Sequence, residues 1–255
     1  MAIANWYKHS SYYGILIWDI ETSKIVKNFT TCDKKCISDI KYSPDGKNLA
    51  ISELNKISIW NLESNECIKN FISERPVSKI HYSPDGKNIL VHSTGSNIEI
   101  WNITTGKNTK IFQEYRENVS SIGYSPNGTY LYCNHGENIH ILDLYNNTVS
   151  ELRGHERFVY SIDYSPDSKY FASSSLDKTI CIWESSSKKC LKILHNDEYI
   201  ENINYSQDGT HLVGCRHYNT DHVYIWDTRL WKCTIIKYDR ARYVKMDKKY
   251  LHVLF

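Results

Sequence analysis

Two residues of this 255-residue chain, His155 and Asp177, are of the types that form a catalytic dyad in a hydrolase. His155 and Asp177 have serines nearby in the sequence, and a histidine held by a carboxylate can take the proton of a serine hydroxyl. However, the sequence contains no nucleophile elbow, no phosphate-binding glycine loop and no His-Glu-x-x-His motif. The elements that position these two residues must therefore decide their role.

A second group of residues has the composition of a metal site. The stretch HLVGCRHYNTDH contains His211, Cys215, Asp221, His217 and His222. Imidazole and thiolate are good zinc ligands. Yet no Cys-x-x-Cys pair anchors this stretch, the Cys-x-x-x-Cys at 32–36 has no matching second pair, and alternation along a strand would set the side-chain directions. We expect no metal and no cofactor, and we interpret 211–222 as an enlarged recognition loop.

Composition and charge exclude several classes of protein. The formal net charge is +2, and no block of five or six like charges suggests binding to nucleic acid or to an acidic membrane. No apolar run reaches membrane-spanning length, and the first residues lack the order of a signal peptide. The eight cysteines have no framework spacing, so we expect reduced thiols in a cytoplasmic or nuclear protein.

The chain is an array of repeats. YSPDGKN stands at 42–48 and again at 82–88, and worn copies of its first five residues follow: YSPNG at 124–128, YSPDS at 164–168 and YSQDG at 205–209. A second ladder has tryptophan at 18, 60, 101, 183 and 226, with leucine at 142. Both ladders have a period of about 41 residues, so we expect a single domain over 1–255.

The clearest repeat, 152–194, predicts four short strands. VYSIDY, KYFASSS, TICIWE and CLKIL have the alternation and the residue types of strands. Ser-Pro-Asp supplies a type I turn after the first strand, and the glycine that usually follows adopts a positive φ. Ser168 replaces this glycine here, which weakens the turn without removing it.

Such a sheet cannot bury both faces alone. The residues three and one before each tryptophan position are aliphatic in all six repeats. Radial stacking lets each sheet cover the next, and closing the ring removes the exposed ends.

At this point the sequence resembles the WD-repeat family. Gly154-His155, the YSPDS turn, Asp177 and Trp183 match the signature of that family in order and spacing. The resemblance implies an all-β fold, a β-propeller. It also implies a buried hydrogen-bond network of His155, Asp177, Trp183 and a serine of the second strand, which we assign to Ser175, with Ser173 as the alternative. The structural role is then favoured over a hydrolase dyad.

The other repeats depart from this pattern. The residues at the position of His155 are Asp33, Ser73, Tyr115 and Asn196, and those at the position of Asp177 are Leu54, Gly95, Gly136 and Thr220. Only one sheet keeps the full network, so the other sheets are expected to rely on packing.

The number of third strands predicts six four-stranded blades. A first strand around ARYVK, near the C-terminus, would complete the N-terminal blade and close the ring. One second strand, AIAN or YLHVLF, is then surplus. The family more often has seven blades.

The resemblance also suggests where partners bind, because such rings present the loops before the first strand. Two residues beyond the position of His155 the chain has Lys35, Arg75, Glu117, Arg157 and Glu198, with Arg240 or Arg242 completing the set. Aromatic residues in the same loops are Tyr115, Phe158 and Tyr199. Charged and aromatic side chains of this kind fix the register of a peptide or protein partner.

We therefore predict a non-catalytic scaffold or adaptor for protein or peptide partners, without nucleic acid or membrane binding. The sequence does not determine the oligomeric state, and a monomer is favoured. The alternative is an enzyme, hydrolase-like, with its site at the mouth of the channel. Such an enzyme would place acids or histidines with perturbed pKa values there.

Overall fold

The computed structural model describes residues 2–9, 12–19, 24–30, 37–95, 98–112, 119–216, 222–237, 243–246 and 251–254. Every regular element in these ranges is a β-strand. The described residues accordingly include no helix with the length and apolar character needed to cross a membrane. The chain forms two compact units, residues 1–117 and 118–255, and each is described by itself.

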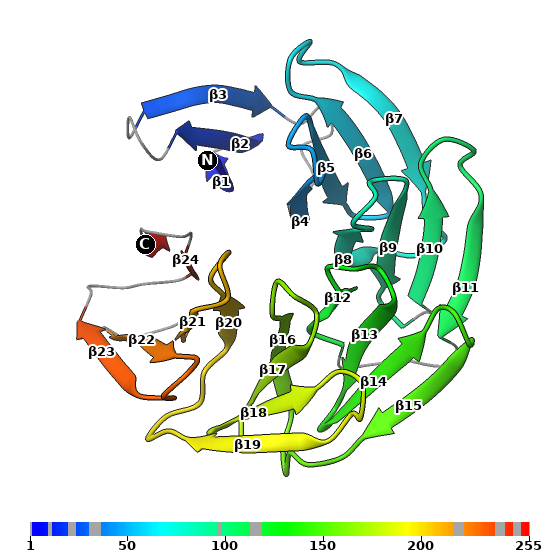
Figure 1. Ribbon diagram of the computed structural model, residues 1–255. Helices are drawn as coiled ribbons and strands as arrows, with labels where there is room; N and C mark the ends of the chain where they lie inside the picture. The colour runs from blue at the N-terminus through cyan, green and yellow to red at the C-terminus, as the bar shows by residue number, and fades with distance from the viewer. Residues whose placement is uncertain are drawn as a thin grey trace. The chain divides into compact units, whose positions relative to one another are not determined.

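The first unit contains three antiparallel sheets (Figure 1). A three-stranded sheet comprises β1 (Ala2–His9), β2 (Tyr12–Asp19) and β3 (Lys24–Thr30). The next sheet comprises β4 (Ile37–Tyr42), β5 (Asn48–Glu53), β6 (Lys56–Asn61) and β7 (Cys67–Ile72). The last comprises β8 (Val77–Tyr82), β9 (Asn88–Ser93), β10 (Ile98–Asn102) and β11 (Asn108–Phe112).

The second unit contains three four-stranded sheets and one pair of strands. The first sheet comprises β12 (Ile122–Tyr124), β13 (Tyr130–His135), β14 (Asn138–Asp143) and β15 (Thr148–Leu152). The second comprises β16 (Val159–Tyr164), β17 (Tyr170–Ser175), β18 (Thr179–Glu184) and β19 (Cys190–His195). The third comprises β20 (Asn202–Tyr205), β21 (His211–Cys215), β22 (His222–Asp227) and β23 (Cys233–Lys237). Strands β24 (Tyr243–Met246) and β25 (Leu251–Leu254) pair with each other.

The all-β prediction is confirmed for the described residues, and five sheets have the four antiparallel strands expected of a repeat. The four strands predicted within 152–194 are β16 to β19. Of the two candidates for a surplus strand, both form strands: AIAN opens the eight-residue β1, and LHVL is β25.

The Ser-Pro-Asp-Gly turns have the predicted geometry. The amide of Gly46 donates to the carbonyl oxygen of Ser43 over 2.9 Å, and the φ of Gly46 is 71°. The Asp45 carboxylate accepts the Ser43 hydroxyl at 2.6 Å and the Lys47 amide at 3.0 Å. The turn is therefore held by its own side chains and needs no tertiary contact.

Ser168 adopts the same backbone conformation as those glycines, with a φ of 59°. This is a strained conformation for a residue with a side chain. Its hydroxyl accepts the amide of Asn127, in the corresponding turn of the preceding sheet, over 3.0 Å. Ser168 thus weakens its own turn but adds a hydrogen bond between two neighbouring sheets, which offsets that loss.

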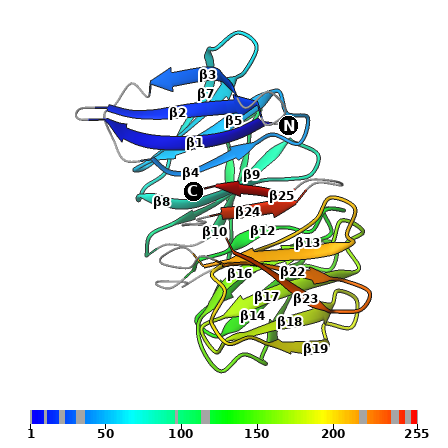
Figure 2. The ribbon, with the colours of Figure 1, turned by 90° about the vertical axis from the view of Figure 1, so that its left-hand side faces the viewer.

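Within each unit, successive sheets pack face to face through their aliphatic stripes. Ile57 and Ile59 of β6 are 0% and 1% exposed, and they form one cluster with Val77 and Ile80 of β8. The first strands are also linked directly: the Asp39 carboxylate accepts the amide of Ile80 over 3.1 Å. Figure 2 shows β4 and β8 side by side.

Candidate functional site

The histidine, aspartate and tryptophan of the 152–194 repeat share one hydrogen-bond network. Trp183, on β18, donates from Nε1 to the hydroxyl of Ser173 on β17 over 2.8 Å. The same hydroxyl lies 2.7 Å from Nε2 of His155, in the loop before β16. Nδ1 of His155 lies 2.9 Å from the carboxylate of Asp177, in the turn after β17. The network therefore ties a loop and a turn to two neighbouring strands.

The serine of this network is Ser173, which corrects the assignment of Ser175. Trp183 lies opposite Phe171 in the strand register. Ser173 is the next residue on that face of β17, whereas Ser175 lies about 7 Å further along the strand. Ser175 instead donates to the carbonyl oxygen of Arg157 over 2.9 Å and accepts the amide of Asp177 over 3.1 Å.

Serine, histidine and aspartate are thus connected as in a serine hydrolase, but the site has no room for a substrate. Ser173 is 0% exposed, as is the side chain of His155. The Ser173 oxygen already accepts the indole N–H. Burial lowers the pKa of His155 below its usual value, although the Asp177 carboxylate acts in the opposite direction. A neutral ring that donates from Nδ1 and accepts at Nε2 satisfies every group, so this is a structural network.

Two sheets of the first unit satisfy their tryptophan by other means, which corrects the expectation that they rely on packing alone. Trp60 donates from Nε1 to the Ser58 hydroxyl over 3.1 Å. Trp101 donates to the Glu99 carboxylate over 3.0 Å. In both cases the acceptor lies two residues earlier on the same strand, where alternation brings it to the same face.

The residues that replace Asp177 in other repeats have a backbone explanation. Leu54, Gly95 and Gly136 have φ values of 48°, 62° and 63°. Glycine suits such a position because it lacks a Cβ atom. At this position these turns therefore require a residue with a positive φ, whereas the 152–194 repeat has an aspartate there.

Several candidate partner-binding residues lie just before a first strand. We call this end of each sheet the loop end, and the opposite end, which carries the Ser-Pro-Asp turn, the turn end. At the loop end of the second unit, the half-buried ring of Phe158 lies 5.3 Å from that of Tyr160. The Tyr160 ring stacks on that of Tyr199, with centroids 5.5 Å apart. Residues of two neighbouring sheets thus form one aromatic row.

Arg216 closes this row at its Tyr199 end. Its guanidinium lies 4.1 Å from the centroid of the Tyr199 ring, and Nη2 donates to the phenol oxygen over 2.6 Å. Nη1 lies 3.6 Å from the carboxylate of Glu198. Tyr199, Glu198 and Arg216 therefore form one connected group, and the exposed Arg157 directly precedes Phe158 in the chain.

Two members of this group, Tyr160 and Arg216, were not among the sequence candidates. Tyr160, on β16, is two residues beyond Phe158, which lies just before that strand, so an i, i+2 spacing was an available signal. Arg216 directly follows β21, the second strand of its sheet. At the corresponding position after β17 the chain has the uncharged Leu176. The contact of Arg216 with Tyr199, in the loop before the neighbouring strand β20, could not be deduced from spacing.

The candidates of the first unit are described in part. Arg75 is exposed, and its Nη1 donates to the carbonyl oxygen of Gly95 over 2.8 Å. The remaining candidates lie outside the described residues: Lys35, Tyr115, Glu117, Arg240 and Arg242.

The described part of the 211–222 stretch does not assemble a metal site. His211 begins β21 and Cys215 ends it, so these residues are about 13 Å apart. His217 and Asp221 lie outside the described residues. Among the residues that are described, no group of three or more histidine, cysteine, aspartate or glutamate side chains could hold a metal ion.

Two family models match the chain. The model of the WD domain, G-beta repeat, matches residues 146–184, which include the whole network of His155, Ser173, Asp177 and Trp183. The model of eukaryotic translation initiation factor eIF2A matches residues 4–134.

Individual relatives are similar over different shares of their length. The intraflagellar transport protein 122 homolog of Homo sapiens is 35% identical over 98 residues, which are 38% of this chain and 8% of that protein. The protein LST8 homolog of Drosophila melanogaster is 24% identical over 68% of this chain and 60% of its own length. Periodic tryptophan protein 2 of Arabidopsis thaliana is 24% identical over 84% of this chain and 24% of its own length. The chain thus spans less than two thirds of each of these proteins.

Proposed function

Because the chain belongs to the WD-repeat family, we propose that it is a non-catalytic scaffold that binds protein or peptide partners at the loop end of its sheets. The observation that carries this proposal is the row of Phe158, Tyr160, Tyr199 and Arg216 in the second unit. Aromatic residues and arginine dominate the binding energy of protein interfaces. These rings are held by one another before any partner arrives, so little side-chain entropy is lost on binding.

Charges border this row. Arg157 and Glu198 carry opposite signs, and such charges at the rim of an interface set partner orientation and association rate more than affinity. For the first unit we propose that Lys35, Arg75, Tyr115 and Glu117 take part in binding partners. We place the binding of partners in the cytoplasm or nucleus.

We further propose that residues 1–255 form one six-bladed ring. Five four-stranded sheets support this count. The three strands β1 to β3 lack one strand of a blade, and β24 is the first strand that would complete it. Strand β25 would then be the surplus second strand.

The competing function is a hydrolase-like enzyme with its site at the mouth of the channel. His155 and Asp177 give it no support, because their serine is fully buried. His81, on the first strand β8, has a pKa lowered to about 4 by burial and by the positive charge of Lys41. This is the kind of perturbed residue that an enzyme would require, but a neutral histidine held by the Tyr82 carbonyl at 2.8 Å also fits a structural role.

A second candidate function is a part in translation initiation, which rests on the match of residues 4–134 to the eIF2A model. It predicts initiation factors or ribosomal subunits among the captured partners, and sedimentation with ribosomes in a sucrose gradient.

The test is capture of partners by the tagged chain, identified by mass spectrometry. The variant Arg75→Glu/Arg157→Glu should lose partners that the native chain retains in stoichiometric amounts. The matched control is Lys107→Glu/Lys189→Glu, because these exposed lysines lie in the turns between third and fourth strands of the same two sheets. This control makes the same change of charge at the turn end.

The outcomes separate the proposals. Loss of a partner in the arginine variant alone supports binding at the loop end. Equal capture by all three proteins would place binding on another surface. If the native chain captures nothing, the enzyme becomes the better hypothesis, and screening of hydrolase substrates follows.

A further inference from the structure

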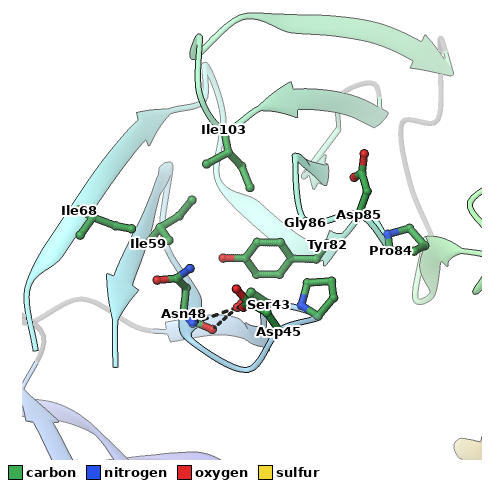
Figure 3. A pocket seen from close by; sticks show the side chains of 11 residues that line it. Ser43, Asp45, Asn48, Ile59, Ile68, Tyr82, Pro84, Asp85, Gly86 and Ile103 are labelled. Atoms are coloured by element: carbon green, nitrogen blue, oxygen red, sulfur yellow. Dashed lines mark hydrogen bonds between the residues drawn. The ribbon is translucent and has the colours of Figure 1, made fainter. Parts of the chain in front are cut away.

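A pocket of 420 Å³ lies at the turn end of the first unit, between the β4–β7 and β8–β11 sheets. Its apolar walls come from Ile59 and Ile68 of the first sheet and from Tyr82 and Ile103 of the second (Figure 3). Ile68 is 52% exposed at its border. The volume is within the range of sites that hold a small ligand or a large side chain.

Tyr82 brings an unsatisfied polar group to this pocket. The residue is 5% exposed, and its phenol oxygen is buried without a hydrogen-bond partner among the described residues. Figure 3 shows this oxygen on the side of the pocket where Asn48, Ile59 and Ile68 lie. A buried hydroxyl without a hydrogen-bond partner is unfavourable. An acceptor placed in the pocket would remove this penalty.

Asn48, which lines the pocket, differs from the residues at the same position of two other repeats. Asn48 is the first residue of β5, and Tyr130 and Tyr170 are the first residues of the corresponding strands β13 and β17. In the second unit the Tyr130 ring packs against the core cluster that contains Tyr164, the counterpart of Tyr82. Lys188 of the next sheet lies over the Tyr130 ring, 6.0 Å from its centroid. There a tyrosine occupies the space that Asn48 leaves open.

The polar border of the pocket is acidic. Hydrogen bonds from the Ser43 hydroxyl and the Lys47 amide hold the pKa of Asp45 below its usual value. The Ser83 hydroxyl and the Lys87 amide do the same for the pKa of Asp85. Both carboxylates are therefore ionised at neutral pH. Lys87 Nζ lies 4.0 Å from Asp85 and the positive charge of Lys47 acts on Asp45, so both carboxylates have a lysine nearby and both remain exposed to a further cation.

We propose that this pocket binds an extended peptide segment of a partner, with a leucine, methionine or phenylalanine side chain between Ile59 and Tyr82. A carbonyl oxygen of that segment accepts the Tyr82 hydroxyl, and a lysine or arginine next to the apolar residue pairs with Asp45. Strand β8 runs from the loop of Arg75 to Tyr82, so this is a second docking site, at the opposite end of the sheet from Arg75.

The test uses labelled peptides of the form Gly-Ser-Lys-X-Lys-Ser-Gly and fluorescence polarisation. For the native chain we expect binding with X as leucine or phenylalanine, and at least about tenfold weaker binding with X as alanine. Glutamate in place of the flanking lysines should weaken binding by about fivefold or more.

Two variants locate the site. Asn48→Tyr imitates the filled space of the second unit and should abolish binding. Its matched control is Asn88→Tyr, at the same position of the next sheet, because Asn48 and Asn88 accept the same hydrogen bond, from Asn61 and Asn102 respectively, over 3.2 Å. Asn88→Tyr should keep the native affinity. Tyr82→Phe, which removes only the unpartnered hydroxyl, should leave folding intact and weaken binding about threefold or more.

The proposal is overturned if no peptide binds at about 1 mM, if X makes no difference, or if native affinity persists in Asn48→Tyr. Arg75→Glu/Arg157→Glu should retain full peptide affinity. Failure of the proposed binding at the loop end is therefore distinguishable from failure of the proposed pocket at the turn end.

Discussion

The indole nitrogen of Trp183 and the hydroxyl oxygen of Ser173 are 2.8 Å apart, on neighbouring strands and both inaccessible to water. This contact begins a chain of hydrogen bonds that continues through His155 to Asp177 at the loop end. Each member donates to the next and none is left without a partner. The 152–194 sheet therefore holds its loop, the loop of Arg157 and Phe158, by a buried polar connection.

Ser173→Ala should destabilise the fold by about 2–3 kcal/mol, because it leaves both the Trp183 indole and His155 without their partner. Ser174→Ala is the matched control. Ser174 is 0% exposed, and its hydroxyl has no partner among the described residues, so its loss should be neutral or slightly stabilising. Urea unfolding followed by circular dichroism measures both. Equal destabilisation by the two substitutions would contradict the assignment of Ser173.

Asp177→Ala should lower the melting temperature without changing which partners are captured. The carboxylate accepts the Thr179 hydroxyl at 2.6 Å and the Glu156 amide at 3.0 Å, in addition to His155. Losing these bonds should lower the free energy of unfolding by about 1–3 kcal/mol. Asp177→Asn keeps an acceptor oxygen and should have a smaller effect. An unchanged melting temperature in the alanine variant would show that the network contributes little.

Leu54→Gly should raise the free energy of unfolding by about 0.5–1 kcal/mol, because glycine adopts a φ of 48° without steric penalty. Leu54 is 42% exposed, so little buried area is lost. Leu144→Gly is a suitable control: Leu144 is 38% exposed but is not among the residues of positive φ, and its loss should be destabilising. Thermal unfolding of the two variants decides the point.

Stability should fall as the pH is lowered from about 6.5 to about 4. His81 has a pKa of about 4 when folded and about 6.5 when unfolded. Between pH 4 and pH 6.5 the unfolded chain binds more protons than the folded chain. The contribution of His81 to stability is therefore complete above pH 6.5 and is lost as the pH falls towards 4. The loss is at most about 3 kcal/mol. Burial lowers the pKa of His155 as well, with the same sign.

His81→Gln should flatten this dependence in melting temperatures measured from pH 4 to 7. The carboxylates with lowered pKa values, Asp45 and Asp85 among them, lose their contribution only below their usual range near 4. The change in stability between pH 6.5 and pH 4 is therefore due to the histidines. A slope that is the same in native and variant proteins would exclude His81 as its cause.

The repeated turns and strands could be predicted because their signals are local. Period-two alternation assigns one face of a strand to the core, and Ser-Pro-Asp-Gly sets four consecutive backbone conformations. The same residues form the same element wherever they recur, and the described strands follow the predicted ones closely. Glycine at 95 and 136 carries a further local signal, the need for a positive φ.

The side-chain partners depended on distances that the sequence does not contain. Ser173 and Ser175 both point to one face of β17, and only the register with β18 brings the first of them to Trp183. Arg216 and Tyr199 meet because two loops of one sheet end side by side. The sequence alone determined the repeat, its four strands and the family. The tertiary structure decided the network serine, the aromatic row and the pocket beside Asn48, because each depends on which side chains the packing of neighbouring strands and sheets brings within reach.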